Sequence, residues 1–545
     1  MGGFPERDKP FRGPRVWRLA VRALLSAGVS ATIPAMTGFT QSRRQFLTGT
    51  TAWLGAAAFG LGAGEGTTKT ISIFHTTDLH GHILPTQTYG GMADVGGFAR
   101  CASCIRDWRR ESPDSLLLDI GDVYQGTAES LMNGGKLMIG LFNRLGYDAW
   151  TLGNHDFDWG PELLECNLAI SNSPVLTGNL ELGGRMPGSL DGAWKAVKPW
   201  VMKDVGGFKI ALIGLVTPGL PYWLAPETLG GVSPTDPAES LKRSLAEARA
   251  AKADAIVVMG HMGWRNDDDF ANPVREILKA NEGVDVFLAG HTHQDKPSWE
   301  LGGVLCSQAS YYGINCGRVD LTFDLDTRKL VQRRAFTMLM DKRFAFDPVV
   351  MEVAQPDLKK ADEQMARKLG TASQVIDGKG RGNRLSKLFC EFFSEALQRN
   401  GTPVDGVFHG TFGTGDIGVG DIRVADCWKM LPYENLLSIV EVSAAELIEI
   451  VREDRKEYNS DRTLWPFELD LDKQGNPTRF LFKGEPVAAD RRFKIGMNSY
   501  DAQSGGRKLM RLREIAAAAT AKRVTTKMDT RGALIDGILN RKEIS

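Results

Sequence analysis

Short apolar runs alternate with amphipathic segments along the chain from about Thr70 to Lys342. Several of the apolar runs have the length and composition of buried strands, at residues 71–78, 115–122, 148–156, 208–218, 255–263 and 284–293. Between some of them lie segments with helical spacing, at residues 137–146, 238–253 and 272–283. This alternation predicts an α/β domain with layered sheets over residues 70–342.

The pattern changes after residue 342. Residues 343–373 contain a charged stretch with helical spacing and are expected to form a linker helix. Residues 374–540 open with an amphipathic helix and continue with short strands between glycine-rich turns. This mixture predicts a second, smaller α+β domain, and a chain of 545 residues is long enough for two domains.

The bulk composition narrows the class of protein. Hydrophobic residues make up 42% of the chain and charged residues 24%, which is typical of a soluble globular protein. Lys plus Arg and Asp plus Glu each total 66, so no global basic field points to nucleic acid as a partner. The 7 cysteines suggest no disulfide framework. Cys101 and Cys104 lie in an amphipathic helix pattern, which favours buried free thiols over a zinc site.

The N-terminal segment has the layout of a cleaved export signal. Arg43 and Arg44 precede a weakly apolar run that is too short to span a membrane and that ends in small residues. The S-R-R-x-F-L core resembles the twin-arginine signal, whose pathway exports folded proteins. We therefore expect residues 1–66 to be an export signal and the twin-arginine translocase to be a partner during export.

Two features of this segment leave alternatives open. A basic amphipathic leader or an uncleaved anchor would share the same composition. Residues 1–35 lie upstream of a conventional signal, and a start at Met36 would give a signal of ordinary length. After cleavage we expect a periplasmic or otherwise exported protein without a stable transmembrane segment.

Polar side chains with metal-binding chemistry follow several of the predicted strands. The chain has only 8 histidines, yet most of them fall at strand ends together with carboxylates and an amide: Asp78, His80, Asp122, Asn154, His155, His261, His291 and His293. The carboxyl ends of parallel strands meet at one edge of a sheet, where ligands gather. A single histidine at a strand end is usually just hydrogen-bonded, but several separate segments converging on one edge are hard to explain in that way.

The ligands in this list are more than one tetrahedral ion needs, and they suit two ions that share a bridge: Asp78, His80, Asp122, Asn154, His261, His291 and His293. Carboxylate oxygen and neutral imidazole nitrogen are ligands for divalent ions such as Zn²⁺, Mn²⁺ and Fe²⁺. Two metals about 3.5–4 Å apart form a clamp for in-line attack at phosphorus and also acidify a bridging water. The sequence therefore predicts two divalent metal ions, without fixing which metals they are.

These motifs together resemble those of a known family. The series D-x-H, G-D, G-N-H-D, G-H and G-H-T-H resembles the signature of the calcineurin-like metallophosphoesterases. The stretches ISIFHTTDLHGH and YDAWTLGNHDFDWG resemble those of the bacterial 5′-nucleotidase branch, and the second domain resembles its C-terminal domain more loosely. The resemblance implies a four-layer α/β/β/α sandwich followed by a smaller α+β substrate-binding domain. It also implies hydrolysis of phosphomonoesters, such as nucleotides or related organic phosphates, by attack of a metal-bridging hydroxide.

The resemblance assigns a role to each motif residue. One metal would be held by Asp78, His80 and His293, and the other by Asn154, His261 and His291. Asp122 would bridge the two ions. His155 resembles the family's catalytic histidine, with Asp158 as the partner that fixes its tautomer and raises its basicity. Asp156 is expected to be structural.

The second domain keeps some of the family's substrate-binding features and lacks others. Relatives stack the base between aromatic side chains in a P-F-G-N segment and before a T-G-G-D segment. Here LPYENLL and NSYDAQSGGRK place Tyr433 and Tyr500 in those positions, and Asn435 is expected to touch the base. Arg507 stands where relatives have a sugar-binding carboxylate, and arginine cannot accept a hydroxyl bond.

A second departure lies in the stretch HGTFGTGDIGVGDIRV, where Thr414 replaces the family's phosphate-contacting arginine. Either the alignment of this stretch with the relatives is shifted, or the leaving group is not an ordinary nucleoside. Arg381 and Arg507 are candidates for binding an anionic substrate, although solvent-exposed arginines without a ligand are as common.

Three alternative functions are compatible with the same residues. The fold also includes a dimanganese sulfur-ester hydrolase of thiosulfate oxidation, but GNHDFDWG keeps the nucleotidase form of the motif. A cyclic-nucleotide or nucleotide-sugar phosphodiesterase would use the same metal ligands. A ligand-binding protein with a vestigial site is the non-enzymatic alternative, and the complete ligand set argues against it. The leading hypothesis is an exported two-metal phosphohydrolase with a small-molecule phosphoester substrate.

Overall fold

The computed structural model describes residues 67–186, 189–457 and 460–545. The predicted export signal at residues 1–66 lies outside the described residues. Among the helices that the structure describes, none combines the length and the apolar character that crossing a bilayer requires.

The first sheet of the N-terminal domain has seven strands in the order β15-β14-β1-β2-β3-β4-β6. Their bounds are Leu330–Leu339 for β15, Asn315–Asp324 for β14, Thr68–Thr76 for β1, Ser115–Asp119 for β2, Ala149–Thr151 for β3, Val175–Leu176 for β4 and Val197–Lys198 for β6. The strands β1, β2, β3 and β4 pair in parallel. Their carboxyl ends therefore meet at one edge.

The second sheet has six strands in the order β12-β13-β11-β10-β8-β7. Their bounds are Asp295–Leu301 for β12, Val304–Ala309 for β13, Val286–Ala289 for β11, Ala255–His261 for β10, Phe208–Val216 for β8 and Trp200–Val205 for β7. The strands β8, β10, β11 and β13 pair in parallel, so this sheet also gathers its carboxyl ends at one edge.

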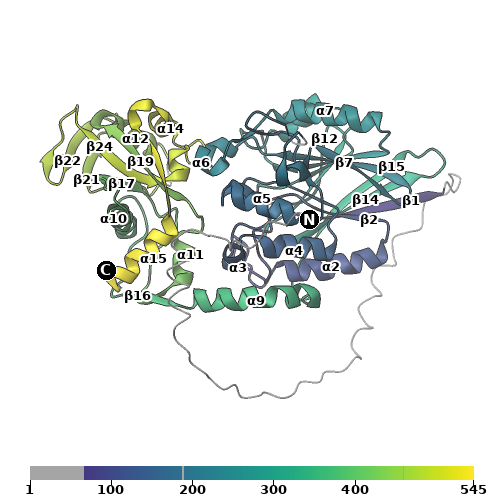
Figure 1. The fold of residues 1–545 in the computed structure, drawn as a ribbon, viewed down its shortest axis with the longest axis horizontal. Helices are drawn as coiled ribbons and strands as arrows, with labels where there is room; N and C mark the ends of the chain where they lie inside the picture. The colour runs from purple at the N-terminus through teal and green to yellow at the C-terminus, as the bar shows by residue number, and fades with distance from the viewer. Residues whose placement is uncertain (1–66, 187–188, 458–459) are drawn as a thin grey trace, which may run out of the picture. The chain divides into compact units, whose positions relative to one another are not determined.

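Successive side chains of each strand point to opposite faces of its sheet, so one strand contributes to two core layers. Ile71 and Ile73 on β1 pack between the two sheets in one core cluster with Met259 on β10. Phe74 points the other way and packs beneath the helices α2 (Phe98–Glu111) and α4 (Lys136–Leu145). Val258 packs on the outer face of the second sheet under α7 (Pro237–Ala250) and α8 (Val274–Ala280). Figure 1 shows α2 and α4 on one side of the strands and α7 on the other. The predicted four-layer α/β/β/α sandwich is confirmed.

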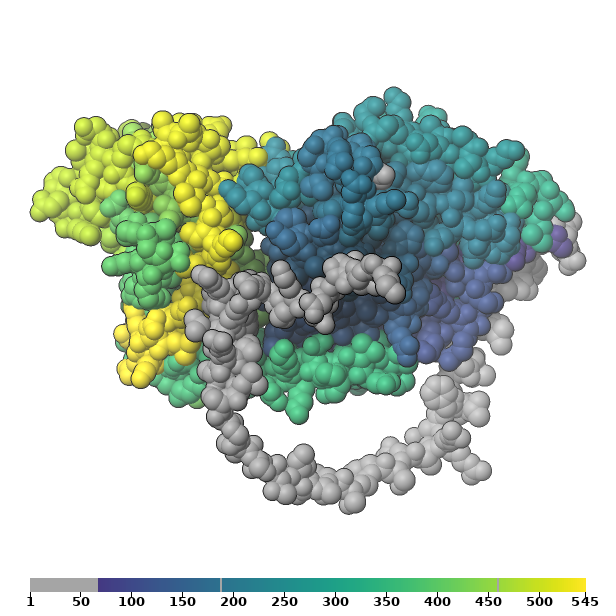
Figure 2. Space-filling model, viewed as in Figure 1, coloured from purple at the N-terminus to yellow at the C-terminus, as the bar shows by residue number. Residues whose placement is uncertain are grey.

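The predicted linker helix is α9, which spans Pro348–Met365. Its first turn is capped by Asp347, whose carboxylate accepts from the backbone N–H groups of Val349 and Val350. Val350, Ala354 and Leu358 are buried in the core of the N-terminal domain, so this helix is packed along that domain (Figure 2).

The C-terminal domain extends beyond both ends of the predicted range of 374–540. Strand β16 (Lys368–Ala372) pairs with β18 (Gly420–Arg423) and with β26 (Glu543–Ile544) at the end of the chain. The pattern of residues 368–372 is too short to distinguish a strand from the end of the preceding helix.

A five-stranded sheet forms the centre of this second domain, in the order β20-β17-β24-β19-β25. The strand bounds are Thr463–Trp465 for β20, Gly406–His409 for β17, Arg492–Asn498 for β24, Leu436–Ser443 for β19 and Val524–Asp529 for β25. The helices α10 (Arg384–Arg399) and α15 (Thr530–Arg541) cover one face, and α12 (Ala444–Asp454) and α14 (Met510–Ala517) cover the other. The predicted α+β character is confirmed.

The remaining elements are short and connect these layers. In the N-terminal domain they are α3 (Ala128–Asn133), η1 (His155–Phe157), α5 (Pro161–Ile170), β5 (Leu180–Leu182), η2 (Gly192–Ala196), η3 (Leu220–Tyr222), α6 (Pro226–Leu229) and β9 (Val232–Pro234). In the C-terminal domain they are α11 (Val424–Met430), β21 (Phe467–Leu471), β22 (Pro477–Phe482), β23 (Glu485–Pro486), α13 (Ser499–Ala502) and η4 (Ala519–Ala521).

Candidate active site

The structure brings the predicted metal ligands together at the strand ends. Two groups of side chains place their ligand atoms within 4.8 Å of one another: Asp78, His80, Asp122 and His293 in one, and Asp122, His261 and His291 in the other. Asp122 belongs to both groups. This arrangement matches a pair of sites that share one carboxylate.

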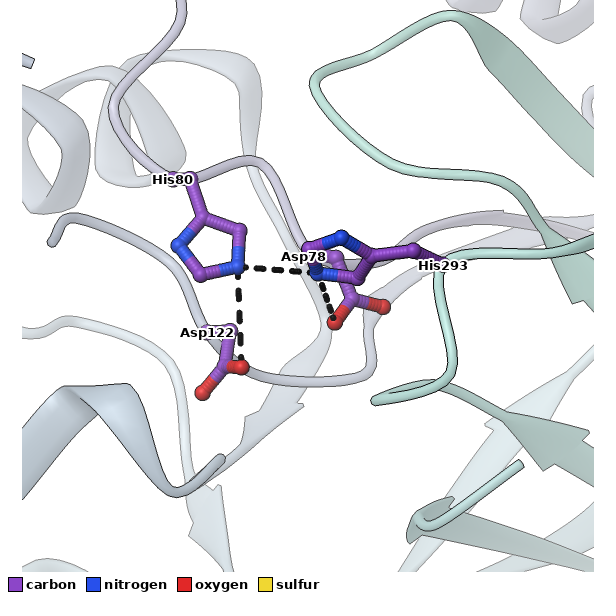
Figure 3. A group of neighbouring side chains, drawn as sticks. All are labelled: Asp78, His80, Asp122 and His293. Atoms are coloured by element: carbon purple, nitrogen blue, oxygen red, sulfur yellow. Dashed lines mark hydrogen bonds and ion pairs between the residues drawn. The ribbon is translucent and has the colours of Figure 1, made fainter. Parts of the chain in front are cut away.

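In the first group, shown in Figure 3, two imidazole nitrogens face each other. His80 Nε2 lies 3.1 Å from His293 Nε2 and 3.6 Å from Asp122 Oδ2. His293 Nε2 lies 3.3 Å from Asp78 Oδ1. Burial lowers the pKa of His80 to about 3, so its ring is neutral, which is the form that binds metal. Two nitrogen lone pairs and two carboxylates aimed at one point suit a divalent cation.

In the second group, buried polar atoms lack hydrogen-bond partners. His261 Nε2 lies 3.1 Å from Asp122 Oδ2, but the geometry is not that of a hydrogen bond. Among the described residues, neither His261 Nε2 nor Asn154 Oδ1 has a hydrogen-bond partner. An unpaired buried polar atom costs about 1–3 kcal/mol. A second divalent ion held by Asp122, His261 and His291 would use the unpaired nitrogen of His261, so the residues present fit two ions.

The backbone that carries the ligands is strained. Asp78, His80, Asp122, His291 and His293 all have positive φ angles, between 47° and 70°. Such conformations are uncommon for residues other than glycine, and they cluster at functional sites where the surrounding structure enforces them. Here hydrogen bonds between loops enforce them, because the Asp78 and His80 N–H groups donate to the Gly121 and Asp122 carbonyls at 2.9 Å.

Asp156 has the structural role that its position suggested. Its carboxylate accepts from the backbone N–H groups of Asp122, Val123 and Gly153 at 2.8–3.0 Å. It thereby joins the loop after β2 to the loop after β3. Gly153 is required at this junction, because a Cβ added there would meet Asp122 Oδ1 at 2.2 Å.

His155 and Asp158 form a hydrogen-bonded pair beside the ligands. His155 Nδ1 lies 2.7 Å from Asp158 Oδ2, and the His155 and His80 rings are 5.2 Å apart. Burial lowers the pKa of His155, but Asp158 and Asp122 outweigh it and raise that pKa to about 10. The pair therefore favours a protonated ring that can stabilise negative charge or donate a proton.

Comparison with known proteins agrees with this geometry. Residues 71–295 match the calcineurin-like phosphoesterase family. The N-terminal domain that contains these residues is called the phosphoesterase domain after this match. The match contains the loops after β1, β2, β3, β10 and β11, which carry the predicted metal ligands.

Relatives named 5′-nucleotidases match beyond the phosphoesterase domain. The 5′-nucleotidase of Vibrio cholerae is 26% identical over 426 residues, which cover 70% of this chain and 75% of that protein. The 5′-nucleotidase of Rattus norvegicus is 31% identical over 351 residues, 59% of each protein. The chain spans 57% to 64% of the length of four 5′-nucleotidases from snakes, cattle and rat that it matches.

The two-domain fold has a counterpart among solved structures. The crystal structure of a 5′-nucleotidase precursor from Thermus thermophilus matches 88% of this chain and 97% of its own, with a TM-score of 0.65 and 24% sequence identity. This likeness confirms that the phosphoesterase domain is followed by a C-terminal domain of the same fold as in that protein.

The C-terminal domain places Tyr433 beside the phosphoesterase domain. The Tyr433 ring stacks on His155 with centroids 5.4 Å apart and planes 12° apart. Tyr433 therefore packs directly on the predicted catalytic histidine, while 46% of its surface remains exposed.

Arg507 of the C-terminal domain also contacts aromatic side chains of the phosphoesterase domain. Its guanidinium carbon is 5.2 Å from the Tyr222 ring centre and 5.3 Å from the Phe270 ring centre. Trp223, next to Tyr222, contacts His291 with ring centres 5.1 Å apart. Arg507 is therefore connected to a predicted metal ligand through Tyr222 and its chain neighbour Trp223.

Other predicted substrate residues have internal contacts. Arg381 donates to the Asp454 carboxylate and to the Asp454 and Glu457 carbonyls. The guanidinium is thus bound within the C-terminal domain, and the substrate contact proposed for it stays a prediction. The backbone carbonyl of Asn435 accepts from Thr530. The Thr414 hydroxyl donates to the Thr411 and Met430 carbonyls, so it does not replace an arginine functionally.

Aromatic residues around His293 were not predicted from the sequence. Tyr89 Oη lies 2.7 Å from His293 Nδ1, and the Tyr311 ring stacks on His293 at 5.0 Å. Tyr89 lies in a loop with no periodic pattern, so its contact with a ligand 204 residues away carries no local signal. If His293 held a metal through Nε2, its Nδ1 would carry the proton and donate to Tyr89.

Tyr89→Phe is expected to weaken metal binding about 10–100-fold, the usual effect of losing an outer-sphere partner of a ligand. Titrating divalent ions into metal-depleted protein measures this affinity. Tyr147→Phe is a matched control, since that hydroxyl contacts Thr76 and no predicted ligand. Equal metal affinity in wild type and Tyr89→Phe would show that Tyr89 does not orient His293.

Proposed function

We propose that the chain is a metal-dependent hydrolase of phosphomonoesters, acting on nucleotides or related organic phosphates. The observation that carries this proposal is the double ligand group that shares Asp122, with the His155–Asp158 pair beside it. The names of the relatives support the substrate class.

The residues of the site would have distinct roles in hydrolysis. Two bound divalent ions would polarise the phosphoryl group and lower the pKa of water. His155, oriented by Asp158, stabilises charge on the transferred group or protonates the leaving oxygen. Asp122 keeps the two ligand groups in a fixed geometry, since its carboxylate also accepts from the His155 N–H at 2.7 Å.

The leaving group would lie against aromatic side chains of the C-terminal domain. Tyr433 and Tyr500 offer flat faces that suit a base or another planar ring. Arg507 is exposed and positively charged, and it stands where a sugar-binding carboxylate was expected. We propose that substrates with an anionic substituent on the leaving group are preferred to plain nucleosides.

A substrate panel tests this function. Protein from its own host is analysed for metal and then given nucleoside monophosphates, other organic phosphates, cyclic nucleotides, nucleotide sugars and thiosulfonate peptides. The proposal predicts metal-dependent release of phosphate from the monoesters. Release confined to the diesters or to the thiosulfonates would establish one of the rival hydrolase functions. Absence of any release from metal-loaded protein would favour a binding protein.

We further propose export through the twin-arginine route, supported by Arg43 and Arg44 in the S-R-R-x-F-L core. Replacing both arginines by lysine is expected to leave an unprocessed precursor in the cytoplasm. Fractionation followed by mass determination of the N-terminus measures this. Normal processing of the double variant would point to another route.

A further inference from the structure

Glu434 is a largely buried carboxylate in the loop between α11 and β19, next to Tyr433. Its side chain is only 11% exposed. Oε2 accepts from Gln125 Nε2 and from Trp159 Nε1, both at 3.1 Å. Oε1 accepts from Arg531 Nη1 at 2.6 Å. Although burial raises the pKa of Glu434, Arg531, Gln125 and Trp159 together lower it, so the carboxylate is ionised.

The two partners in the phosphoesterase domain belong to the loops of the metal site. Gln125 is three residues from Asp122, and its backbone carbonyl accepts from His80 Nδ1 at 2.7 Å. Trp159 directly follows Asp158, and its ring packs 5.2 Å from that of Tyr124. One carboxylate oxygen therefore bonds to the loop that orients His80 and to the loop that carries the His155–Asp158 pair.

The third partner anchors Glu434 in the C-terminal domain. Arg531 on α15 is buried, with its side chain 3% exposed. Its Nε donates to the Leu431 carbonyl at 2.7 Å, and its guanidinium lies 3.6 Å from the Trp428 ring centre. The position of Glu434 is thus set by a helix and a loop of the C-terminal domain, independently of the metal site.

We propose that Glu434 is a positioning residue: it ties the C-terminal domain to the two loops that hold His80 and His155, and these loops reach full order only through it. The C-terminal domain then contributes to the catalytic geometry itself, in addition to binding the leaving group. The kinetic part of this inference rests on the proposed hydrolase function, whereas the ordering of the loops does not.

Hydrogen exchange of the full-length, metal-loaded protein tests the ordering directly. In Glu434→Gln, peptides covering residues 121–127 and 153–160 are expected to exchange on the order of tenfold faster, as for the loss of hydrogen bonds to a charged group. In Trp159→Phe the Glu434–Arg531 pair remains, so only the peptide at 153–160 should exchange faster. This second variant keeps the test valid if Glu434→Gln folds poorly.

Glu391→Gln is the matched control. Glu391 also binds an arginine of α15, Arg541, but its other ion-pair partner, Arg384, lies in the same domain. The Glu391→Gln substitution should lower thermal stability without changing hydrogen exchange at residues 121–127 or 153–160. Unchanged exchange at 121–127 and 153–160 in Glu434→Gln, or equal changes in Glu391→Gln, would overturn the proposal.

The kinetic readout separates positioning from substrate binding. On a hydrolysed monoester, Glu434→Gln is expected to lower kcat on the order of tenfold and to change KM less. A rise in KM alone would make Glu434 part of leaving-group binding and contradict the proposal. If wild type hydrolyses nothing, the proposed function fails, yet the exchange experiment still decides the role of Glu434.

Discussion

Asp122→Asn is expected to abolish binding of at least one metal ion and nearly all hydrolysis, while the protein folds normally. A bridging carboxylate serves both ions, and an amide offers only one neutral oxygen in its place. Loss of an outer-sphere partner already costs about 10–100-fold, so loss of the shared ligand should exceed that range. Metal analysis together with phosphate release measures both effects.

The fold should survive this change for a structural reason. The oxygen of asparagine can still accept from the His155 N–H that Asp122 Oδ1 accepts at 2.7 Å. Asp119→Asn is a suitable control on the preceding strand, because the Asp119 carboxylate accepts from the Thr76 hydroxyl and the Gly121 N–H and belongs to neither ligand group. An Asp122→Asn protein with two metals and wild-type turnover would rule out a shared bridge.

His155→Ala is expected to retain both metals and to slow turnover by about 10²–10⁴, the usual contribution of a positioned acid–base group. His155 lies beside Asn154 but belongs to neither ligand group. The loss should be smaller for esters with good leaving groups such as nitrophenolate, since these need less protonation. Asp158→Asn should show a milder form of the same defect, because Asp158 only orients and polarises the ring.

Parallel assays of metal content and of two esters decide the role of His155. Loss of a metal ion in His155→Ala would make it a ligand. An equal loss on activated and unactivated esters would make it a stabiliser of transition-state charge instead of a proton donor.

The sequence was sufficient to predict the layers and the location of the site. Apolar runs such as residues 71–78 and 255–263 are buried strands, and the histidines after them converge because parallel strands end at one edge. A local pattern of this kind can be recognised in the sequence without knowledge of the fold. The left-handed backbone at Asp78 and Asp122 has no such pattern, because it is enforced by hydrogen bonds between loops.

The residues that support the site could not be predicted in this way. Tyr89 contacts His293, which is 204 residues away in the sequence, and Glu434 contacts Trp159, which is 275 residues away. Neither Tyr89 nor Glu434 lies in a segment with a periodic pattern. Arg381 shows a second limit of the sequence pattern. Its charge suggested an anionic ligand, but Asp454 lies close enough in the fold to bind it. Side-chain charge alone does not distinguish a ligand contact from an internal ion pair.

The most direct test of the two-metal phosphohydrolase is the number of divalent ions per chain that restores hydrolysis to metal-depleted protein. Ions are added stepwise while bound metal and phosphate release from a preferred monoester are measured together. The shared-carboxylate geometry predicts that phosphate release rises only as the second ion binds and saturates at two ions per chain. Full activity with one bound ion, or in protein free of metal, would contradict it.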